Sequence, residues 1–161
     1  MRHFIIITIF MLLSAATLLA GEYLPAFKIN GRSFDKVEIA TGEKARQKGL
    51  MGRSYLADNA GMLFRFDAPG LHCFWMSNTL IPLDVIFLDA DGTVVSIATM
   101  KTEPPRKPGE TQAEYEARLP LYCSRGLCSA ALEVNAGTAA ALGLKTGDTI
   151  PELALDKLPK P

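Results

Sequence analysis

Apolar and polar positions alternate over short segments of this chain, and turn-forming residues separate the segments. An alternation of period two predicts half-buried β-strands. Phe27–Ile29 and Arg32–Phe34 flank Asn30 and Gly31, a pair that favours the positive φ angles of a tight hairpin turn. Residues 67–70 and 89–92 are predicted turns. The remaining strands are predicted at residues 37–39, 62–66, 71–76, 83–88, 93–100 and 130–134, with a last strand near residue 150.

Two short helices are predicted beside these strands. Thr41 is a suitable helix N-cap, and Lys48 with Gly49 suits the end of that helix. An alanine-rich helix follows Thr138 and ends at Gly143. Many short strands with few helices favour a mainly β (α+β) fold, either a compact β-sandwich or a partly closed β-barrel with two or three short helices. The pattern lacks the long crossover helices of a doubly wound parallel sheet.

Residues 101–122 interrupt the alternation with charged residues and four prolines. Within them, Thr111 and Glu114 have the spacing of a capping box, which predicts a short helix inside an otherwise solvated loop. We therefore expect a single domain over residues 21–152, with a Pro-rich insertion at 101–122 and a flexible tail at 153–161.

The first 20 residues have the pattern of a secretory signal peptide. Arg2 precedes an apolar run over residues 4–13, and small residues follow it up to Ala20. A membrane-spanning helix needs about 20 apolar residues, so an uncleaved anchor is the alternative interpretation. Cleavage is expected after Ala20, with Ala16 as a second possible point. The mature chain is then periplasmic or extracellular and has no stable membrane anchor.

The charge balance excludes one class of partner. The chain has 17 basic and 17 acidic residues, and removal of residues 1–20 takes away Arg2 and no acid, which leaves 16 basic against 17 acidic residues. A nucleic-acid-binding surface needs clustered lysine and arginine. No nucleic-acid partner is therefore expected, and the oligomeric state stays open.

The three cysteines suit an oxidising compartment only in part. Cys123 and Cys128 lie close together in the sequence, so we predict a disulfide that closes a small ring between them. Cys73 is then left over, and its apolar neighbours favour a small buried residue. A reactive Cys73 thiol would need a nearby base, and His72 points to the opposite face of a regular strand.

The stretch from His72 to Asp89 holds the candidate functional residues. If residues 71–76 and 83–88 form adjacent strands, their link is a turn at the rim of the sheet. That turn would bring together the side chains of His72, Trp75, Asn78, Thr79 and Asp84. Arg53 is a further candidate member of this set. An aromatic ring beside amide, hydroxyl and carboxylate groups is a usual mixture in ligand pockets.

Several of these residues have an equally good structural interpretation. Asp84 shares a strand face with apolar residues, and a buried carboxylate must be hydrogen-bonded or paired. Its partners would be backbone N–H groups of residues 77–81 or the guanidinium of Arg53. Asn78 and Thr79 are frequent turn residues, so their presence alone is weak evidence of a site.

Trp75 and His72 are single examples of their kind in the mature chain. Trp75 either stacks on a sugar ring or fills the core, and His72 suits a structural or surface position as well as a catalytic one. Soft ligands for copper(I) exist, but none are spaced as a binding pair, so no metal and no cofactor are expected. These soft ligands are His72, Cys73, Met51, Met62, Met76 and Met100.

A set of sequence blocks carries a family resemblance: Glu38-Ile-Ala, Arg46-Gln-Lys-Gly49-Leu-Met-Gly-Arg53, Asn59-Ala-Gly61-Met-Leu-Phe64, Phe74-Trp-Met76 with Asn78-Thr79, Pro82-Leu-Asp84, and Leu132-Glu-Val-Asn135-Ala-Gly137. Together they resemble the signature blocks of the domain of unknown function 192 family, over about residues 37–150. The resemblance implies a mainly β, sandwich-like fold, found in bacterial and archaeal proteins that are often exported. The family has no settled activity, so the resemblance implies no site residues. The Pro-rich insertion and the pair Cys123 and Cys128 are outside its pattern.

Three functions follow from these residues. The first is a binding domain for a small polar ligand such as a saccharide or cell-envelope fragment, held by Arg53, Trp75, Asn78, Thr79 and Asp84. The second is an envelope hydrolase or lyase that uses Asp84 with His72, in which Glu133 or Asp89 would supply any second carboxylate. The third is a structural envelope protein without a ligand.

Overall fold

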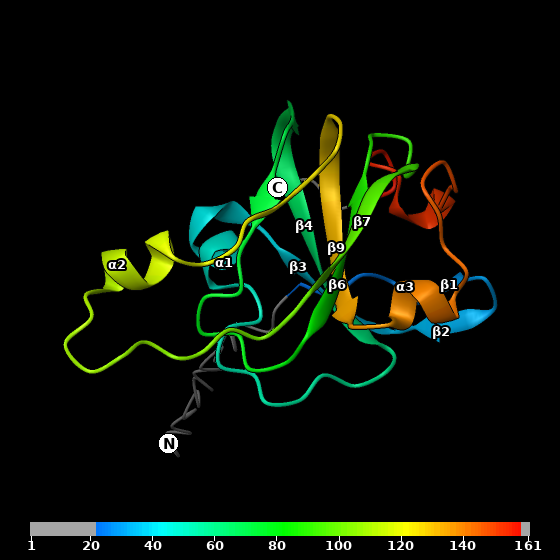
Figure 1. Ribbon diagram of the computed structural model, residues 1–161. Coiled ribbons are helices and arrows are strands. Elements are labelled where there is room, and N and C mark those ends of the chain that lie inside the picture. Colours follow the sequence, from blue (N-terminus) through cyan, green and yellow to red (C-terminus); the bar gives the residue numbers. More distant parts are fainter. Residues whose placement is uncertain (1–21, 159–161) are drawn as a thin grey trace, which may run out of the picture.

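The computed structural model describes residues 22–158, so the signal peptide predicted at residues 1–20 lies outside the described part, as do residues 159–161. The fold is mainly β with three short helices, as predicted (Figure 1). None of the helices within residues 22–158 is long and apolar enough to cross a membrane. The elements are β1 (Phe27–Ile29), β2 (Arg32–Phe34), β3 (Lys36–Ala40), α1 (Gly42–Lys48), β4 (Ala60–Gly70), β5 (Cys73–Phe74), β6 (Leu83–Leu88), β7 (Val94–Met100), α2 (Gln112–Ala117), β8 (Tyr122–Cys123), β9 (Cys128–Asn135), α3 (Thr138–Ala141) and the 3₁₀ helix η1 (Pro151–Leu153).

A five-stranded sheet in the order β3-β4-β9-β6-β7 forms the centre of the molecule. Strands β3 and β4 are parallel and α1 connects them, whereas the other neighbouring strands are antiparallel. The sheet is open rather than closed into a barrel, and two further sheets of two strands each, β1-β2 and β5-β8, accompany it. Sequence reasoning found both ends of β6 because its apolar run is continuous, as is usual for a central strand buried on both faces.

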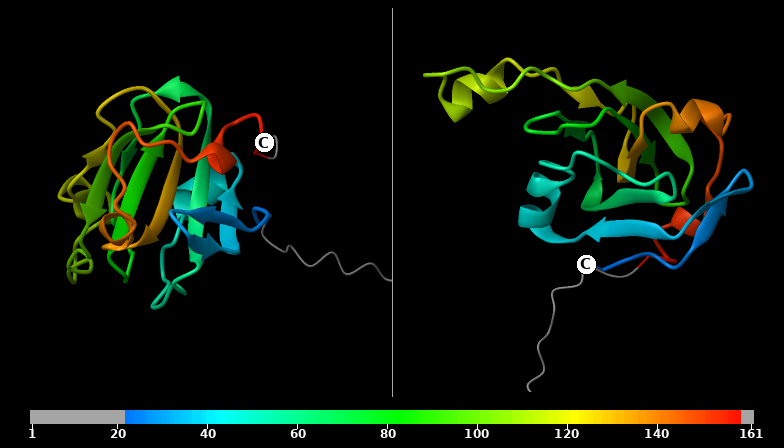
Figure 2. Two further views of the ribbon diagram at one scale, coloured as in Figure 1. Left: turned by 90° about the vertical axis from the view of Figure 1, so that its right-hand side faces the viewer. Right: turned by 90° about the horizontal axis from the view of Figure 1, so that it is seen from below.

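The central sheet buries two separate apolar clusters, one on each face. The α1 face carries side chains at alternate positions that pack towards helix α1, among them Met62, Phe64, Val85, Phe87 and Ala131. The α3 face carries the intervening side chains, which pack towards helix α3, among them Leu63, Ile86, Leu88, Leu132 and Val134. Figure 1 and the right-hand view of Figure 2 show α1 and α2 to one side of the sheet and α3 with β1-β2 to the other.

The predicted hairpin at the start of the chain is confirmed. Phe27 pairs with Phe34 across β1 and β2, and Asn30 and Gly31 have φ angles of 47° and 87°. Its apolar side chains cover part of the α3 face. The second predicted hairpin, β6 with β7 around the turn after Asp89, is also present.

The cysteine prediction is wrong. The disulfide joins Cys73 to Cys123, while Cys128 is a free, buried thiol. Cys73 and Cys123 are direct partners across β5 and β8, which brings their side chains together although 50 residues separate them in sequence. Cys128 instead lies at the start of β9, where its thiol donates to the carbonyl of Gly70.

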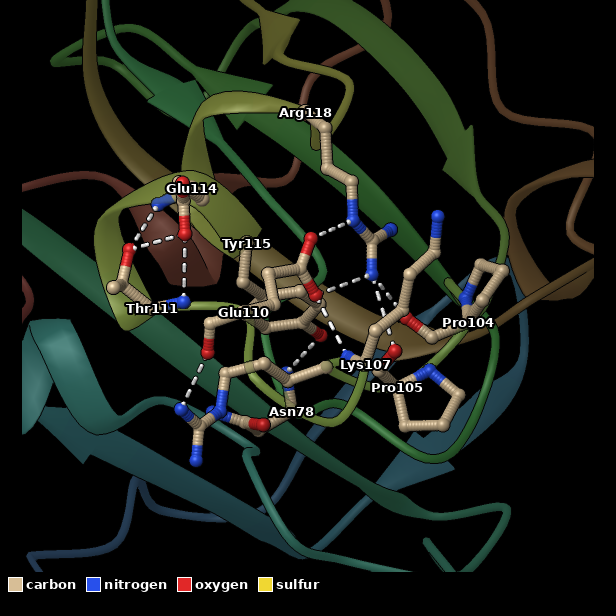
Figure 3. A network of polar contacts seen from close by, with 10 residues as sticks. Asn78, Pro104, Pro105, Lys107, Glu110, Thr111, Glu114, Tyr115 and Arg118 are labelled. Carbon is tan, nitrogen blue, oxygen red and sulfur yellow. Dashed lines mark hydrogen bonds and ion pairs between the residues drawn. The ribbon is translucent and has the colours of Figure 1, made fainter.

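The insertion is an arm anchored to the domain, and it holds the predicted capping box of Thr111 and Glu114 at the start of α2. Tyr115 is 1 % exposed, and its hydroxyl accepts a hydrogen bond of 3.1 Å from the backbone N–H of Asn78. Glu110 and Arg118 form an ion pair of 2.7 Å beside it (Figure 3). The arm thus meets the loop that carries the predicted site residues.

Several predicted segments differ from the structure. Strand β4 continues through residues 67–70, where a turn was predicted, because it resumes pairing with β9 at Gly70 after a register shift. The strand predicted at residues 71–76 is reduced to β5, which pairs with β8 and not with β6. The last predicted strand is a single bridge at Thr149. Residues 153–158 are not a loose tail, because Leu153 and Leu158 are buried against the α3 face.

Candidate functional site

Asp84 is held by the protein itself. Its side chain is 1 % exposed and lies on the α3 face, at the start of β6. One carboxylate oxygen accepts a hydrogen bond of 2.7 Å from the hydroxyl of Thr99, and the other accepts one of 2.9 Å from the backbone N–H of Ala139. The partners considered from the sequence, Arg53 and the 77–81 turn, are not the ones it uses. Asp84 therefore links β6 to β7 and to α3.

Arg53 and Asn78 also have partners within the fold. Arg53 forms a two-pronged ion pair with Glu38, and the shared hydrogen bonds raise the pKa of its guanidinium. Asn78 has a φ angle of 51°, and its backbone carbonyl accepts from the N–H of Gly52. The Gly52–Asn78 contact connects the segment after α1 to the loop after β5, and the ion pair of Arg53 connects the same segment to β3.

A cavity with a volume of about 690 Å³ lies on the α1 face. Pockets that hold a small organic ligand have volumes of about 300–1,000 Å³. Three of the predicted residues line it, namely His72, Trp75 and Thr79, whereas Arg53, Asn78 and Asp84 do not. Most of its wall is apolar and comes from the α1 end, β4, the β5 region and the insertion, including Leu50, Met51, Phe64, Phe66, Phe74 and Leu121.

Local packing explains how the aromatic wall is built. Phe64 and Phe74 meet edge to face with ring centroids 4.9 Å apart. Gly49 ends helix α1 with a φ angle of 46°, and a Cβ at this position would lie 3.4 Å from the Phe64 ring. The absence of a side chain thus lets the end of α1 approach β4 closely. Trp75 is 41 % exposed, so it lies at the rim and not in the core.

Glu133 is the most buried polar residue of the cavity. It lies near the middle of β9 on the α1 face, between Met62 of β4 and Val85 of β6. Its exposed fraction is 5 %, and its carboxyl group forms no hydrogen bond or ion pair with another residue of the range 22–158. Burial without a compensating partner raises its pKa to about 8. At neutral pH this carboxyl is therefore mostly protonated.

His72 lines the cavity, and Cys128 contacts Gly70 of the cavity wall. The His72 ring stacks on Phe66 with centroids 3.5 Å apart, and its Nε2 atom is buried without a hydrogen-bond partner within residues 22–158. Burial raises the pKa of the Cys128 thiol, which is the opposite of what a nucleophilic cysteine requires. Within the described residues, no three His, Cys, Asp or Glu side chains gather as metal ligands.

The comparisons with known proteins agree with this fold. The model of the domain of unknown function 192 (DUF192) family, described as "Uncharacterized ACR", matches residues 26–151. The chain belongs to the DUF192 family. The match ends one residue into η1, so the whole central sheet and the cavity belong to the family domain. A search of curated proteins finds no significant match.

Two solved structures are similar to this DUF192 protein. A protein of unknown function from Novosphingobium aromaticivorans is 33 % identical, with a TM-score of 0.61 over 81 % of this chain and 91 % of the other. A Sinorhizobium meliloti protein with the provisional description of a transcription regulator is 34 % identical, with a TM-score of 0.59 over 77 % of this chain and 87 % of the other. Both support the fold, and neither description names a ligand.

Of the two buried acids of this DUF192 domain, Glu133 lines the cavity and Asp84 does not. Sequence reasoning named Glu133 only as a possible second carboxylate. The signal that could have identified it is an acidic residue inside the apolar run of residues 130–134, because a glutamate is rarely buried in such a run unless it has a function or a partner. A protonated carboxyl group surrounded by apolar walls can donate one hydrogen bond or, once ionised, pair with a cation.

Proposed function

We propose that this protein is an exported ligand-binding domain whose site is the cavity on the α1 face. The ligand is a small organic molecule with an apolar body and one polar end, since the cavity has aromatic and aliphatic walls and a single deeply buried carboxyl group, that of Glu133. The unpartnered burial of Glu133 is the observation that carries this proposal. Such burial is unfavourable in the free protein, and a bound polar group would compensate for it.

The compartment is part of the proposal. The sequence of residues 1–20 has the pattern of a signal peptide, and the disulfide between Cys73 and Cys123 is typical of oxidising compartments. Both features support a periplasmic or extracellular location.

A saccharide is a weaker candidate than an amphipathic ligand. Sugars present many hydroxyl groups, each of which needs a hydrogen-bond partner when it is buried. The deep part of the cavity offers few such partners, because only Glu133 and Thr79 are buried polar residues among those that line it. Trp75 at the rim still provides one ring face for stacking.

The hydrolase or lyase alternative has less support. It pairs Asp84 with His72, but Asp84 lies on the α3 face and does not line the cavity that His72 lines. The Sinorhizobium relative is provisionally described as a transcription regulator, but the equal numbers of basic and acidic residues in this chain, 17 each, do not favour a nucleic-acid partner.

A thermal-shift screen of small amphipathic compounds tests the proposal. Compounds that raise the melting temperature of the wild type are expected to bind Trp75→Ala and Glu133→Gln more weakly. Tyr55→Ala is the matched control for the aromatic change, because Tyr55 is 75 % exposed and does not line the cavity. Hits whose affinity is the same in the wild type and in both cavity variants would place binding elsewhere and refute the site.

A further inference from the structure

No positively charged side chain of the cavity forms an ion pair with Glu133. Its neighbours on β4 and β6, Met62 and Val85, are uncharged. The titratable side chains that line the cavity are Glu43, Arg46 and Lys48 from α1, Asp67 from β4, and His72 before β5. Arg46 is paired with Asp67 at 3.2 Å, and none of these groups forms an ion pair with Glu133.

The second buried polar residue of the cavity is an acceptor. Thr79 is 7 % exposed, and its hydroxyl donates its hydrogen to the carbonyl of Ser77 at 3.2 Å. Because a hydroxyl has one hydrogen and two lone pairs, the Thr79 oxygen can only accept from a ligand. Ionised Glu133 likewise only accepts. Thr79 and ionised Glu133 therefore match a ligand that supplies N–H donors.

The walls suit a cation as well as an apolar group. Phe64, Phe74 and Trp75 all line the cavity, and Phe64 and Phe74 meet edge to face. The faces of aromatic rings attract ammonium groups, and several rings together form the aromatic cages that bind them. Aromatic rings and one unpaired carboxyl group are complementary to an organic ammonium ion.

We propose that the cavity binds a ligand with a protonated amine on an apolar body, and that the ammonium group pairs with the carboxylate of Glu133. This inference rests on the proposed function and adds the chemical class of the ligand. The ammonium group donates to Glu133 and to the Thr79 hydroxyl oxygen, and the apolar body lies against the phenylalanine and leucine side chains that line the cavity.

Binding of this kind releases a proton from Glu133 to the solvent. The pKa of this carboxyl is about 8 in the free protein, so at neutral pH the bound cation must displace a proton. The affinity for an amine therefore rises about tenfold for each pH unit below 8 and levels off above it. A neutral ligand that accepts a hydrogen bond from protonated Glu133 shows the opposite trend, with affinity falling above that pKa.

Isothermal titration of the mature protein with matched six-carbon probes tests the inference. n-Hexylamine is the cationic probe and 1-hexanol is its neutral counterpart, each titrated from about pH 6 to about pH 8. We expect hexylamine to bind more tightly than hexanol, with affinity that rises with pH. Glu133→Gln should weaken the binding of hexylamine at least about tenfold and weaken that of hexanol much less. Glu152→Gln, an exposed change outside the cavity, should alter neither.

The outcomes distinguish a failure of the ammonium proposal from a failure of the proposed ligand-binding function. The ammonium proposal would be overturned if hexanol bound as tightly as hexylamine. It would also be overturned if Glu133→Gln left the affinity for hexylamine unchanged. Either result is compatible with a ligand-binding cavity. If neither probe binds at any pH, the ammonium proposal fails, and failure of the amphipathic screen as well removes the proposed function.

Discussion

Two buried carboxyl groups lie on neighbouring strands of one sheet and have opposite surroundings. Asp84 on β6 points to the α3 face and accepts from Thr99 and Ala139. Glu133 on β9, one register position away, points to the α1 face and has no partner within residues 22–158. The acid of the α3 face thus holds elements together, whereas the acid of the α1 face lines a cavity and has no partner among the described residues. Burial alone does not identify a functional acid, and burial without partners beside a cavity is the feature on which we base the proposed site.

The disulfide joins Cys73, which lines the cavity, to Cys123 of β8. Replacing Cys73 and Cys123 with serine opens a link between residues 50 apart, and the chain-entropy model gives a loss of about 4 kcal/mol in the free energy of unfolding. Urea unfolding measures this loss. Because Leu121 precedes Cys123 and lines the cavity, amine binding should weaken as well.

Cys128→Ala is the control, since it removes a thiol and keeps the disulfide. A larger loss from Cys128→Ala than from the double variant would contradict the assigned bond. Peptide mapping of the unreduced protein that finds Cys123 joined to Cys128 would do the same.

Removal of the Asp84 carboxylate tests the α3 face. Asp84→Ala leaves the buried N–H of Ala139 without its acceptor, and we expect it to lower the free energy of unfolding by about 3 kcal/mol. Thr99→Val removes only the hydroxyl donor and should cost about 1 kcal/mol. Binding in the cavity should survive both changes when measured well below the melting temperature. Loss of binding in the folded Asp84→Ala protein would mean that Asp84 belongs to the site after all.

The pH dependence of stability tests the α1 face. Below pH 4.5 the Glu133 carboxyl is protonated in both states, whereas between 4.5 and about 8 only the folded state keeps the proton. The free energy of unfolding attributable to Glu133 therefore decreases as the pH rises, by about 1.4 kcal/mol for each pH unit. The difference between wild type and Glu133→Gln, followed by urea unfolding across this range, isolates this contribution. An equal slope in both proteins would show that Glu133 has an ordinary pKa.

Local sequence patterns predicted the local structure well. The alternation of residues 27–34 with Asn30 and Gly31 predicted the first hairpin, and the spacing of Thr111 and Glu114 predicted the capping box of α2. These features depend on contacts between residues close in sequence. For the same reason the apolar run of β6 was assigned correctly.

The sequence did not predict which strands and cysteines far apart in the chain pair with each other. Cys123 and Cys128 were paired because they are near in the chain, whereas the structure pairs Cys73 with Cys123 through the β5-β8 ladder. The strand at β5 was expected beside β6, and its actual partner lies about fifty residues further along the chain. Asp84 and Glu133 both occur in buried strands, so only the register of β6 against β9 shows that they face opposite sides.

The pKa of Glu133 in the ligand-free protein is the most direct test of this account. A pH titration of the side-chain carboxyl carbon by NMR, assigned by its loss in Glu133→Gln, measures it at the site itself. We expect a pKa of about 8, because burial disfavours the charged form and no residue of the described range compensates for it. A pKa at or below the ordinary value of 4.5 would mean that the Glu133 carboxyl is hydrated or paired, and this result would contradict the proposed ligand site.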